Sequence, residues 1–250
     1  MTQPLHIGLL GAMQEEIGSD LSHLKGLSYS DHGDLRIHSG SWGDEVRLSL
    51  AWSGWGKVSA ARAATRLLAS DPSIDLLVFT GVAGAADPAL SQWDVVLADA
   101  VVQHDMDARP LYPRFTLPAL NQDRLQPQPP WFDWAKTLLE AHNAGDLKGF
   151  ARPSSGLIAT GDRFIGDPAV LQKLRDALPD LQAVEMEGAA VAQVAEQEGI
   201  PWLVLRVISD GADETAAQSF EDFVKRYEQQ AWRLIEALLQ RCKDAPRRCA

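Results

Sequence analysis

The sequence has few cysteines and no cluster of basic residues. Its two cysteines, Cys242 and Cys249, lie in the polar segment after Leu239 and form no cluster with histidine of the kind that binds zinc. This excludes a disulfide framework, and we expect no metal site. The formal net charge is −11, and the lack of clustered Lys and Arg argues against a phosphate backbone as a partner, so we expect no nucleic-acid binding.

Long hydrophobic runs and nucleotide-binding motifs are missing as well. The run Leu5–Leu10 lacks a basic leader and is much shorter than the roughly 20 residues of a membrane span. We interpret it as the buried first strand of a cytoplasmic protein that does not bind membranes. No Gly-x-Gly-x-x-Gly follows this strand and no Gly-Lys-Ser/Thr occurs, so a dinucleotide-dependent oxidoreductase or a nucleoside-triphosphate enzyme lacks its usual signature.

The composition is that of a globular protein. Apolar residues make up 46% and charged residues 23% of the 250 residues, and no repeat, low-complexity linker or abrupt change in composition divides them. We therefore expect one domain over residues 1–241 and a solvated C-terminal tail at 242–250.

Short apolar runs alternate with amphipathic stretches. Runs bounded by Gly, Asp or Pro predict buried strands at Ile7–Leu10, Val46–Trp52, Leu76–Thr80, Val95–Ala98, Leu157–Thr160 and Leu203–Ile208. Apolar residues at three- and four-residue spacing predict helices at Lys57–Ala69, Trp131–His142, Ala169–Leu178, Gly188–Gly199 and Phe220–Leu239. The alternation favours an α/β fold with a mixed central sheet flanked by helices. The prolines of Arg109–Pro130 predict a long surface loop.

Polar or small residues follow several of these runs, where α/β sheets bind ligands. The segments are Gly11–Glu16, Thr80–Ala86, Gly161–Ile165, Ala183–Ala190 and Ser209–Asp213. Small residues such as Ala83 and Gly84 permit close approach of a ligand to the backbone, or form only a tight turn. Phe164 either stacks on a base or packs in the core.

Carboxylates stand out in these segments. Glu16 is either functional or a solvated acid at the start of a helix. Glu185 and Glu187 flank Met186 beside an apolar helix, where a charge is costly unless it meets hydrogen-bond donors. They either bind the hydroxyls of a ligand or form a buried salt bridge. Asp210, after a strong apolar run, is either a proton donor or a helix cap.

The order and spacing of these segments resemble the nucleoside phosphorylase superfamily, and most closely its hydrolytic branch, the bacterial 5′-methylthioadenosine/S-adenosylhomocysteine nucleosidases. The resemblance runs from Leu5 to about Leu239. The matching segments are Ile7–Glu16, Ser53–Val58, Thr80–Gly84, His104–Asp107, Gly161–Ile165, Val184–Gly188, Arg206–Asp210 and Ser219–Phe223.

This resemblance implies hydrolysis of a purine N-glycosidic bond, with a small purine nucleoside as the partner and no cofactor. Such a site must assist both an oxocarbenium-like sugar and a poor leaving group. The family pattern implies that Asp210 protonates the purine at N7 and that Glu16 orients and deprotonates the attacking water. Glu187 would bind the ribose 2′- and 3′-hydroxyls. Asp210 then needs a raised pKa, which a poorly solvated strand end supplies.

The same resemblance assigns the remaining site residues and an oligomeric state. Phe164 would stack on the base, Met186 would pack under the ribose, and an apolar pocket would hold the 5′-substituent. A homodimer is implied, because the family completes this pocket with a neighbour's loop, for which Ala108–Pro118 is the candidate. The expected substrate-binding residues are Glu187, Met186, Phe164, Ile165, Ser209, Ala83, Gly84, Met13, Trp55 and Phe220.

Three alternatives stay open in the sequence. A phosphorylase would use phosphate as nucleophile, but this chain has Phe79 where many phosphorylases have arginine, and Glu16 would repel phosphate. An aminofutalosine-type nucleosidase is an alternative because Val82, Trp55 and Leu111 depart from the usual Ser, aliphatic and aromatic residues. A nucleoside-binding protein without catalysis would have lost the acids, which are all present.

Overall fold

A mixed sheet forms the centre of the computed structural model, which describes residues 3–142, 147 and 149–247. In these residues nine strands lie in the order β2-β3-β4-β1-β5-β8-β7-β6-β9. β1 pairs in parallel with β4 and β5, and β3 is antiparallel to both its neighbours. This confirms the expected fold class. The strands are β1 (Leu5–Gly11), β2 (Lys25–His32), β3 (Leu35–Trp42), β4 (Val46–Trp52), β5 (Leu76–Ala85), β6 (Val95–Gln103), β7 (Pro153–Thr160), β8 (Leu181–Glu185) and β9 (Trp202–Asp210).

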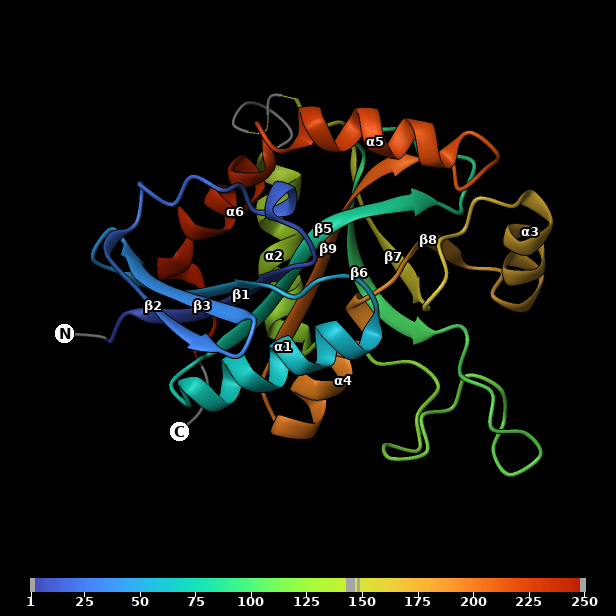
Figure 1. Ribbon diagram of the computed structural model, residues 1–250, viewed down its shortest axis with the longest axis horizontal. Coiled ribbons are helices and arrows are strands. Elements are labelled where there is room, and N and C mark those ends of the chain that lie inside the picture. The colour runs from blue at the N-terminus through green and yellow to red at the C-terminus, as the bar shows by residue number, and fades with distance from the viewer. Residues whose placement is uncertain (1–2, 143–146, 148, 248–250) are drawn as a thin grey trace.

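Part of the sheet closes on itself. Strands β5, β8, β7, β6 and β9 pair in a continuous circuit that returns to β5, and β1, β4, β3 and β2 extend from it (Figure 1). β5 and β8 are antiparallel and meet only at their carboxyl ends, where Gly84 lies opposite Val184. This crossing places the carboxyl end of β8 beside the carboxyl ends of β5 and β9. In an ordinary antiparallel ladder, the carboxyl ends of two paired strands lie at opposite edges of the sheet.

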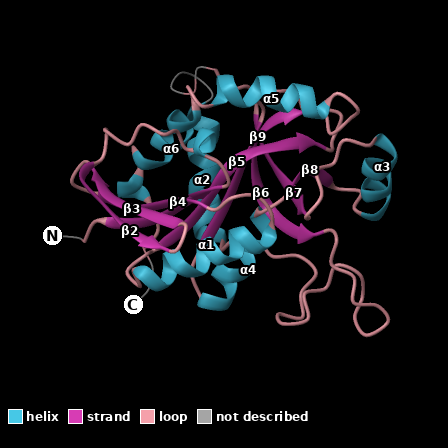
Figure 2. Ribbon diagram, in the orientation of Figure 1, coloured by secondary structure: helices cyan, strands magenta, loops and turns pink. Residues whose placement is uncertain are grey.

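Helices cover both sides of the sheet (Figure 2). On one side α1 (Lys57–Ser70) packs against α4 (Gly188–Glu198), and on the other lie α2 (Pro129–His142), α5 (Ala216–Tyr227) and α6 (Ala231–Leu239). α3 (Pro168–Ala177) lies at the end of the molecule near β7 and β8 (Figure 1). Strand β5 is buried along its whole length, as expected when helices cover both faces.

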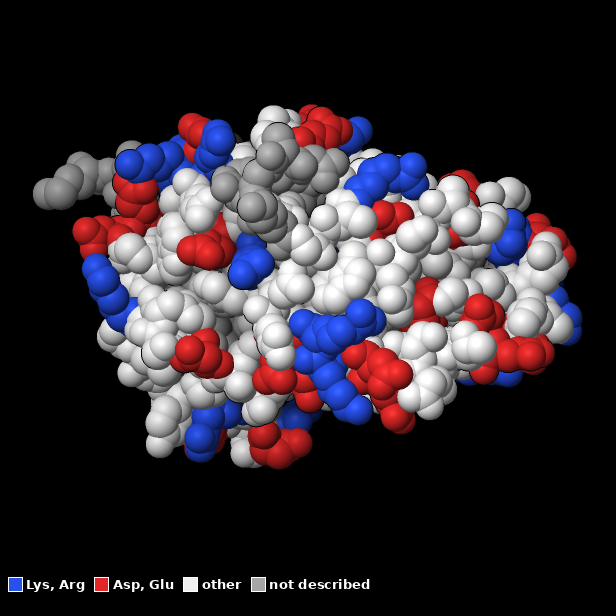
Figure 3. Space-filling model, turned by 90° about the horizontal axis from the view of Figure 1, so that it is seen from above, with Lys and Arg blue, Asp and Glu red and all other residues white. Residues whose placement is uncertain are grey.

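The surface over α5 mixes charges of both signs. Lys and Arg side chains lie beside Asp and Glu on this face, seen from above in Figure 3. Within the described ranges, no helix is long and apolar enough to cross a membrane.

The helix expected over Phe220–Leu239 is interrupted, which corrects that prediction. α5 ends at Tyr227 and α6 begins at Ala231. Between the two helices, the backbone N–H of Gln230 donates to the Tyr227 carbonyl. α5 packs on β9 and on the short 3₁₀ helix η1 (Gln14–Glu16), whereas α6 packs on α2. Because apolar residues recur at helical spacing on both sides of the break, the periodicity did not reveal it.

The C-terminal residues and several strands also differ from expectation, because β2, β3 and β8 were not predicted and β5 is longer than expected. β2 is exposed along almost its whole length, so it carries no buried apolar run that would have predicted it. The Thr80–Ala86 segment is not a tight turn, because β5 continues through it to Ala85. The tail is not fully solvated: Cys242 and Ala245 are buried against the core around η2 (Cys242–Asp244), and Cys249 lies outside the described residues.

The proline-rich segment forms the long surface loop expected of it, up to the start of α2 (Figure 1). Leu111 at its tip is 84% exposed, and the chain returns to the body through a bridge between Val101 and Leu125. Pro129 and Pro130 instead begin α2, where a missing backbone N–H costs no helical hydrogen bond.

Candidate active site

One cavity lies where the ends of β1, β5, β8 and β9 meet. Every residue to which the sequence assigned a catalytic or substrate-binding role lines it. The structure thus brings together side chains from segments up to two hundred residues apart in the chain. The lining residues are Ala12, Met13, Glu16, Trp55, Val82, Ala83, Gly84, Arg163, Phe164, Ile165, Val184, Glu185, Met186, Glu187, Ser209, Asp210 and Phe220.

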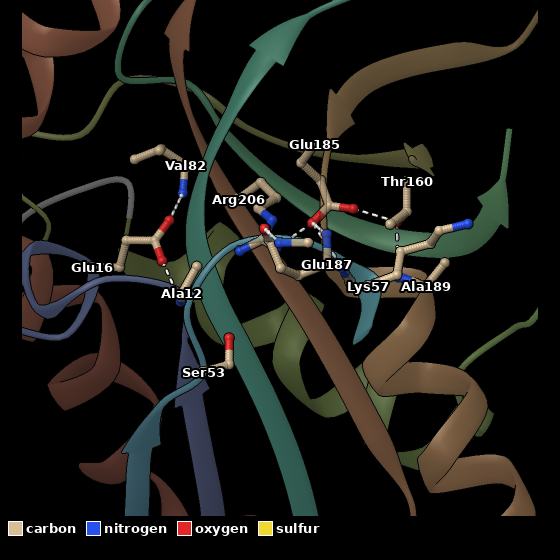
Figure 4. Close-up of polar contacts among 12 residues, drawn as sticks. Ala12, Glu16, Ser53, Lys57, Val82, Thr160, Glu185, Glu187, Ala189 and Arg206 are labelled. Atoms are coloured by element: carbon tan, nitrogen blue, oxygen red, sulfur yellow. Dashed lines mark hydrogen bonds and ion pairs between the residues drawn. The ribbon is translucent and has the colours of Figure 1, made fainter. Parts of the chain in front are cut away.

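Among the described residues, only backbone amides donate hydrogen bonds to the Glu16 carboxylate. Its Oε2 accepts from the nitrogens of Ala12 (2.5 Å) and Met13 (3.1 Å), and its Oε1 accepts from Val82 N at 3.0 Å (Figure 4). Gly81 has φ +153°, and a Cβ there would lie 2.2 Å from Glu16 Oε1, so only glycine leaves room for the carboxylate. Glu16 is therefore a buried and oriented acid, not the solvated one that was the alternative.

Burial raises the pKa of Glu16, while Arg206 and the backbone donors oppose this effect. A buried carboxylate with a raised pKa is a stronger base than a solvated one, and its fixed oxygens accept a proton from a defined direction. The electrostatics thus suit a general base.

Arg206, in the middle of β9, is fully buried and organises the acids. Its guanidinium lies over the Phe79 ring at 4.2 Å, makes an ion pair with Glu185 and lies 3.9 Å from Glu187 Oε2 (Figure 4). Burial acts to lower the pKa of Arg206, but Glu185, Glu16 and Glu187 outweigh it and raise the pKa. We did not single out Arg206, although an arginine inside an apolar strand signals buried acidic partners.

Glu185 and Glu187 both line the cavity and both lie close to Arg206, but they differ in their hydrogen bonds. Glu185 forms the closer ion pair and also accepts from the Thr160 hydroxyl and from the Gly188 backbone amide at 2.7 Å. Glu187 lies 3.9 Å from the guanidinium, and its Oε1 accepts from Gly56 N at 2.7 Å. Burial and the neighbouring Glu185 raise the pKa of Glu187 to about 8, although Arg206 opposes the shift.

Asp210 ends β9 at the opposite wall of the cavity. It is 5% exposed and accepts from Ser209 Oγ at 2.7 Å and from Ala212 N at 2.8 Å. Burial raises the pKa of Asp210 despite these donors, which is the direction that a proton donor needs. A Cβ at Gly84 would lie 3.0 Å from Asp210 Oδ1, so the small residue permits close approach here.

Aromatic rings form the outer wall of the cavity. Phe220 makes edge contacts with Trp55 at 6.0 Å and with Phe164 at 5.9 Å between ring centroids. Trp55 is 54% and Phe164 40% exposed, so Phe164 is not the core residue that was its alternative. Such rings offer a flat base or an apolar substituent a surface to pack on.

Comparisons with known proteins agree with this architecture. The model of the phosphorylase superfamily matches residues 6–240. The 5′-methylthioadenosine/S-adenosylhomocysteine nucleosidase of Staphylococcus aureus (strain JH9) is 34% identical over 233 residues, which are 93% of this chain and 98% of the relative.

Solved structures with the same fold include nucleosidases and a futalosine hydrolase. The adenine complex of the nucleosidase from Colwellia psychrerythraea 34H has a TM-score of 0.89 and 31% identity, covering 98% of this chain and 99% of that one. The nucleosidase of Neisseria meningitidis with methylthio-immucillin-A has a TM-score of 0.85 and 28% identity, with 94% and 99% covered. Futalosine hydrolase of Helicobacter pylori strain 26695 has a TM-score of 0.84 and 29% identity, with 95% and 99% covered.

Proposed function

This chain belongs to the phosphorylase superfamily, and from that membership we propose that it hydrolyses the N-glycosidic bond of an adenine nucleoside, releasing adenine and the free ribose derivative. The observation that carries the proposal is the convergence of Glu16, Glu187 and Asp210, each buried, on one cavity. Because similar enzymes act on 5′-methylthioadenosine and S-adenosylhomocysteine, these are the substrates proposed.

Asp210 is the proposed general acid. Its raised pKa keeps a proton available, and its Ser209 and Ala212 contacts fix the direction in which the carboxyl points. Protonation of the purine at N7 as the glycosidic bond breaks makes adenine a neutral leaving group. Phe164 then supplies the flat surface against which the base rests, with Ile165, Ala83 and Gly84 around its edge.

Glu16 is the proposed general base, and it acts on water. The backbone donors of Ala12, Met13 and Val82 leave the carboxylate no rotational freedom, so a water bound to it has one position relative to the sugar. Glu187, next to Met186, is the proposed partner of the ribose 2′- and 3′-hydroxyls, because the oxygens of an ionised carboxylate accept from both. With a pKa of about 8, the ionised form of Glu187 gains as the pH rises towards 8.

Hydrolysis fits this cavity better than phosphorolysis. Glu16 Oε1 and Arg206 Nη1 both lie close to Gly81, because a Cβ on this glycine would be 2.2 Å from the first atom and 2.6 Å from the second. The Glu16 carboxylate thus already lies beside the guanidinium to which a phosphate would bind. Phe79 lies buried under the same guanidinium and offers no charge. A phosphate would therefore meet a carboxylate at the nucleophile position.

Liquid chromatography of 5′-methylthioadenosine incubated with the protein tests the reaction directly. We expect adenine at equal rates with and without phosphate, together with the free 5-methylthioribose. Release that requires phosphate and yields a sugar-1-phosphate would overturn the hydrolytic assignment, and no adenine release from 5′-methylthioadenosine, S-adenosylhomocysteine or aminofutalosine would overturn the enzymatic one.

The 5′-substituent would lie in the apolar region bordered by Met13, Trp55 and Phe220. Trp55 narrows this region with a large, half-exposed ring. The structural likeness to a futalosine hydrolase supports an aminofutalosine-type substrate as the second candidate. Relative kcat/KM for the two nucleosides decides between them.

We also propose a cytoplasmic homodimer that works in methionine salvage. Large apolar side chains near the cavity loops are exposed in the single chain, with Val58 81% and Leu111 84% accessible. Leu111 belongs to Ala108–Pro118, a proline-stiffened loop that loses little entropy on docking. Light scattering that finds a fully active monomer would contradict the dimer.

A further inference from the structure

The N-terminus of α1 holds two carboxylates that come from other parts of the chain. Gly56 N donates to Glu187 Oε1 at 2.7 Å, and Lys57 N donates to Asp162 Oδ1 at 2.8 Å. Gly56 occupies the N-cap position and has no side chain to cap the helix. Asp162, from the loop after β7, therefore caps α1 across the fold, at the end of the helix where the dipole favours negative charge.

The Lys57 side chain closes this arrangement into a ring. Its Nζ lies 2.6 Å from Asp105 Oδ1, in the loop after β6, and Asp105 Oδ2 accepts from Asp162 N at 3.0 Å. Lys57, Asp105 and Asp162 thus each contact the other two, although 105 positions separate the first from the last. The Lys57 and Asp105 side chains are only partly exposed, 18% and 33%, so water screens their ion pair less than at an open surface, whereas Asp162 is exposed.

The ring is fixed to the cavity through Gly56. This residue has φ +87°, and a Cβ on it would lie 3.0 Å from Asp162 Oδ1, so the approach of the two loops leaves little space for a side chain. Gly56 directly follows Trp55 and donates to Glu187. Movement of Asp162 would therefore release the first turn of α1, and with it the only hydrogen bond to Glu187 Oε1 among the described residues.

We propose that the ring of Lys57, Asp105 and Asp162 is a positioning device that fixes Glu187 for binding the nucleoside sugar. The inference rests on the proposed function and adds three residues to it that do not line the cavity. They act through the Gly56 amide, which must remain in place for Glu187 to present a fixed, ionised carboxylate to two hydroxyls.

This role predicts a change in binding more than in bond cleavage. The groups that face Glu187 are Glu185 and Glu16, which raise its pKa, and Arg206 and the Gly56 amide, which lower it. Weakening the Gly56 contact removes one of the groups that favour the ionised form, so the pH at which substrate binding improves moves upward. A role limited to capping α1 would lower thermal stability without this shift.

Asp162→Ala tests the positioning role through its KM and pH profile, and Asp162→Asn is the matched control, because asparagine caps a helix as well as aspartate does, whereas alanine does not. Wild-type protein is first assayed for adenine release from 5′-methylthioadenosine, and kcat and KM of each variant are then measured between about pH 6 and 9. We expect Asp162→Ala to raise KM about tenfold, with kcat within about threefold of wild type, as expected when binding common to ground and transition state is lost. The acid limb of kcat/KM should move to higher pH, and Asp162→Asn should restore most of both.

Lys57→Met tests the ring from its other side, and Arg47→Met is the matched control. Lys57→Met should raise KM in the same direction, because Asp105 loses its partner. Arg47, in β4, makes an ion pair at 3.0 Å with Asp71, which directly follows α1, and neither residue lines the cavity. Its loss should leave KM and the pH profile unchanged.

Absence of adenine release by wild type would refute the proposed function. Release by wild type with an unchanged KM in Asp162→Ala, or an equal effect in Arg47→Met, would refute the positioning role alone. An Asp162→Asn variant no better than Asp162→Ala would refute it as well.

Discussion

Replacement of Asp210 by asparagine separates binding from proton transfer. Asp210 accepts from Ala212 N at 2.8 Å and from Ser209 Oγ at 2.7 Å. The amide oxygen of asparagine preserves the first contact, and its NH₂ donates to the Ser209 hydroxyl, which still has the Ala83 carbonyl as its own acceptor at 3.2 Å. The side chain thus keeps its place, and we expect nucleoside affinity within about tenfold, or ~1.4 kcal/mol, of wild type.

Turnover should fall far more than affinity. An amide has no proton to give to N7, and general acid catalysis contributes on the order of 10²–10⁴ in rate, equivalent to ~2.7–5.4 kcal/mol of barrier. The effect on kcat therefore exceeds the largest expected effect on binding by at least tenfold. The burial that raises the pKa of Asp210 supports the upper part of this range, because it keeps the acid protonated when the base departs.

Single-turnover adenine release, followed by chromatography, measures the chemical step, and calorimetric titration with 5′-methylthioadenosine measures binding. We expect Asp210→Asn to bind and not to turn over. Retention of more than about a tenth of the wild-type rate, below the usual contribution of general acid catalysis, would refute the proton-donor role. Asp210 would then be only the cap of the turn that contains Ala212.

Three further changes test other parts of the site. Glu187→Gln should weaken binding at least about tenfold, since its proposed partners are present in the ground state. The same variant should have a higher Tm than wild type above pH 8 in scanning calorimetry. The pKa of Glu187 is about 8 in the folded protein and 4.5 ordinarily, so its contribution to stability is full below pH 4.5 and is lost as the pH rises through 8. Gly81→Ala should lower kcat by about 10² or more with unchanged circular dichroism, because its Cβ would displace Glu16; near-normal kcat would contradict this. Tyr227→Phe should leave the free energy of unfolding in urea within about 1 kcal/mol, because the buried hydroxyl has no hydrogen-bond partner of ordinary geometry among the described residues; a loss above ~2 kcal/mol would reveal one.

Local patterns were sufficient wherever a feature depends on a short stretch of chain. Ile7–Leu10 and Leu203–Ile208 are apolar runs typical of buried strands, so Glu16 and Asp210, which follow them within six residues, were expected near strand ends. Glu16 and Asp210 could be singled out for this reason, and the structure places both in the cavity. The proline-rich loop was predictable in the same way, since proline excludes a helix interior or central strand whatever the rest of the chain does.

Partnerships across the fold could not be read from the sequence. Glu185 and Glu187 are two positions apart and equally acidic, and only the position of Arg206 on β9 gives the first the closer ion pair and leaves the second 3.9 Å from the guanidinium. The closure of β5 onto β8 likewise depends on a pairing between residues 100 positions apart, such as Gly84 and Val184.

The sequence by itself therefore determined which acids stand at the strand ends and what chemistry such acids support, because burial and backbone conformation follow from neighbours in the chain. The tertiary structure alone decided the partners of each carboxylate, the α1 amide that holds Glu187 and the break between α5 and α6. These three features depend on which distant part of the chain packs against a residue. The apolar periodicity of the residue's own segment does not depend on that packing, so it could not predict them.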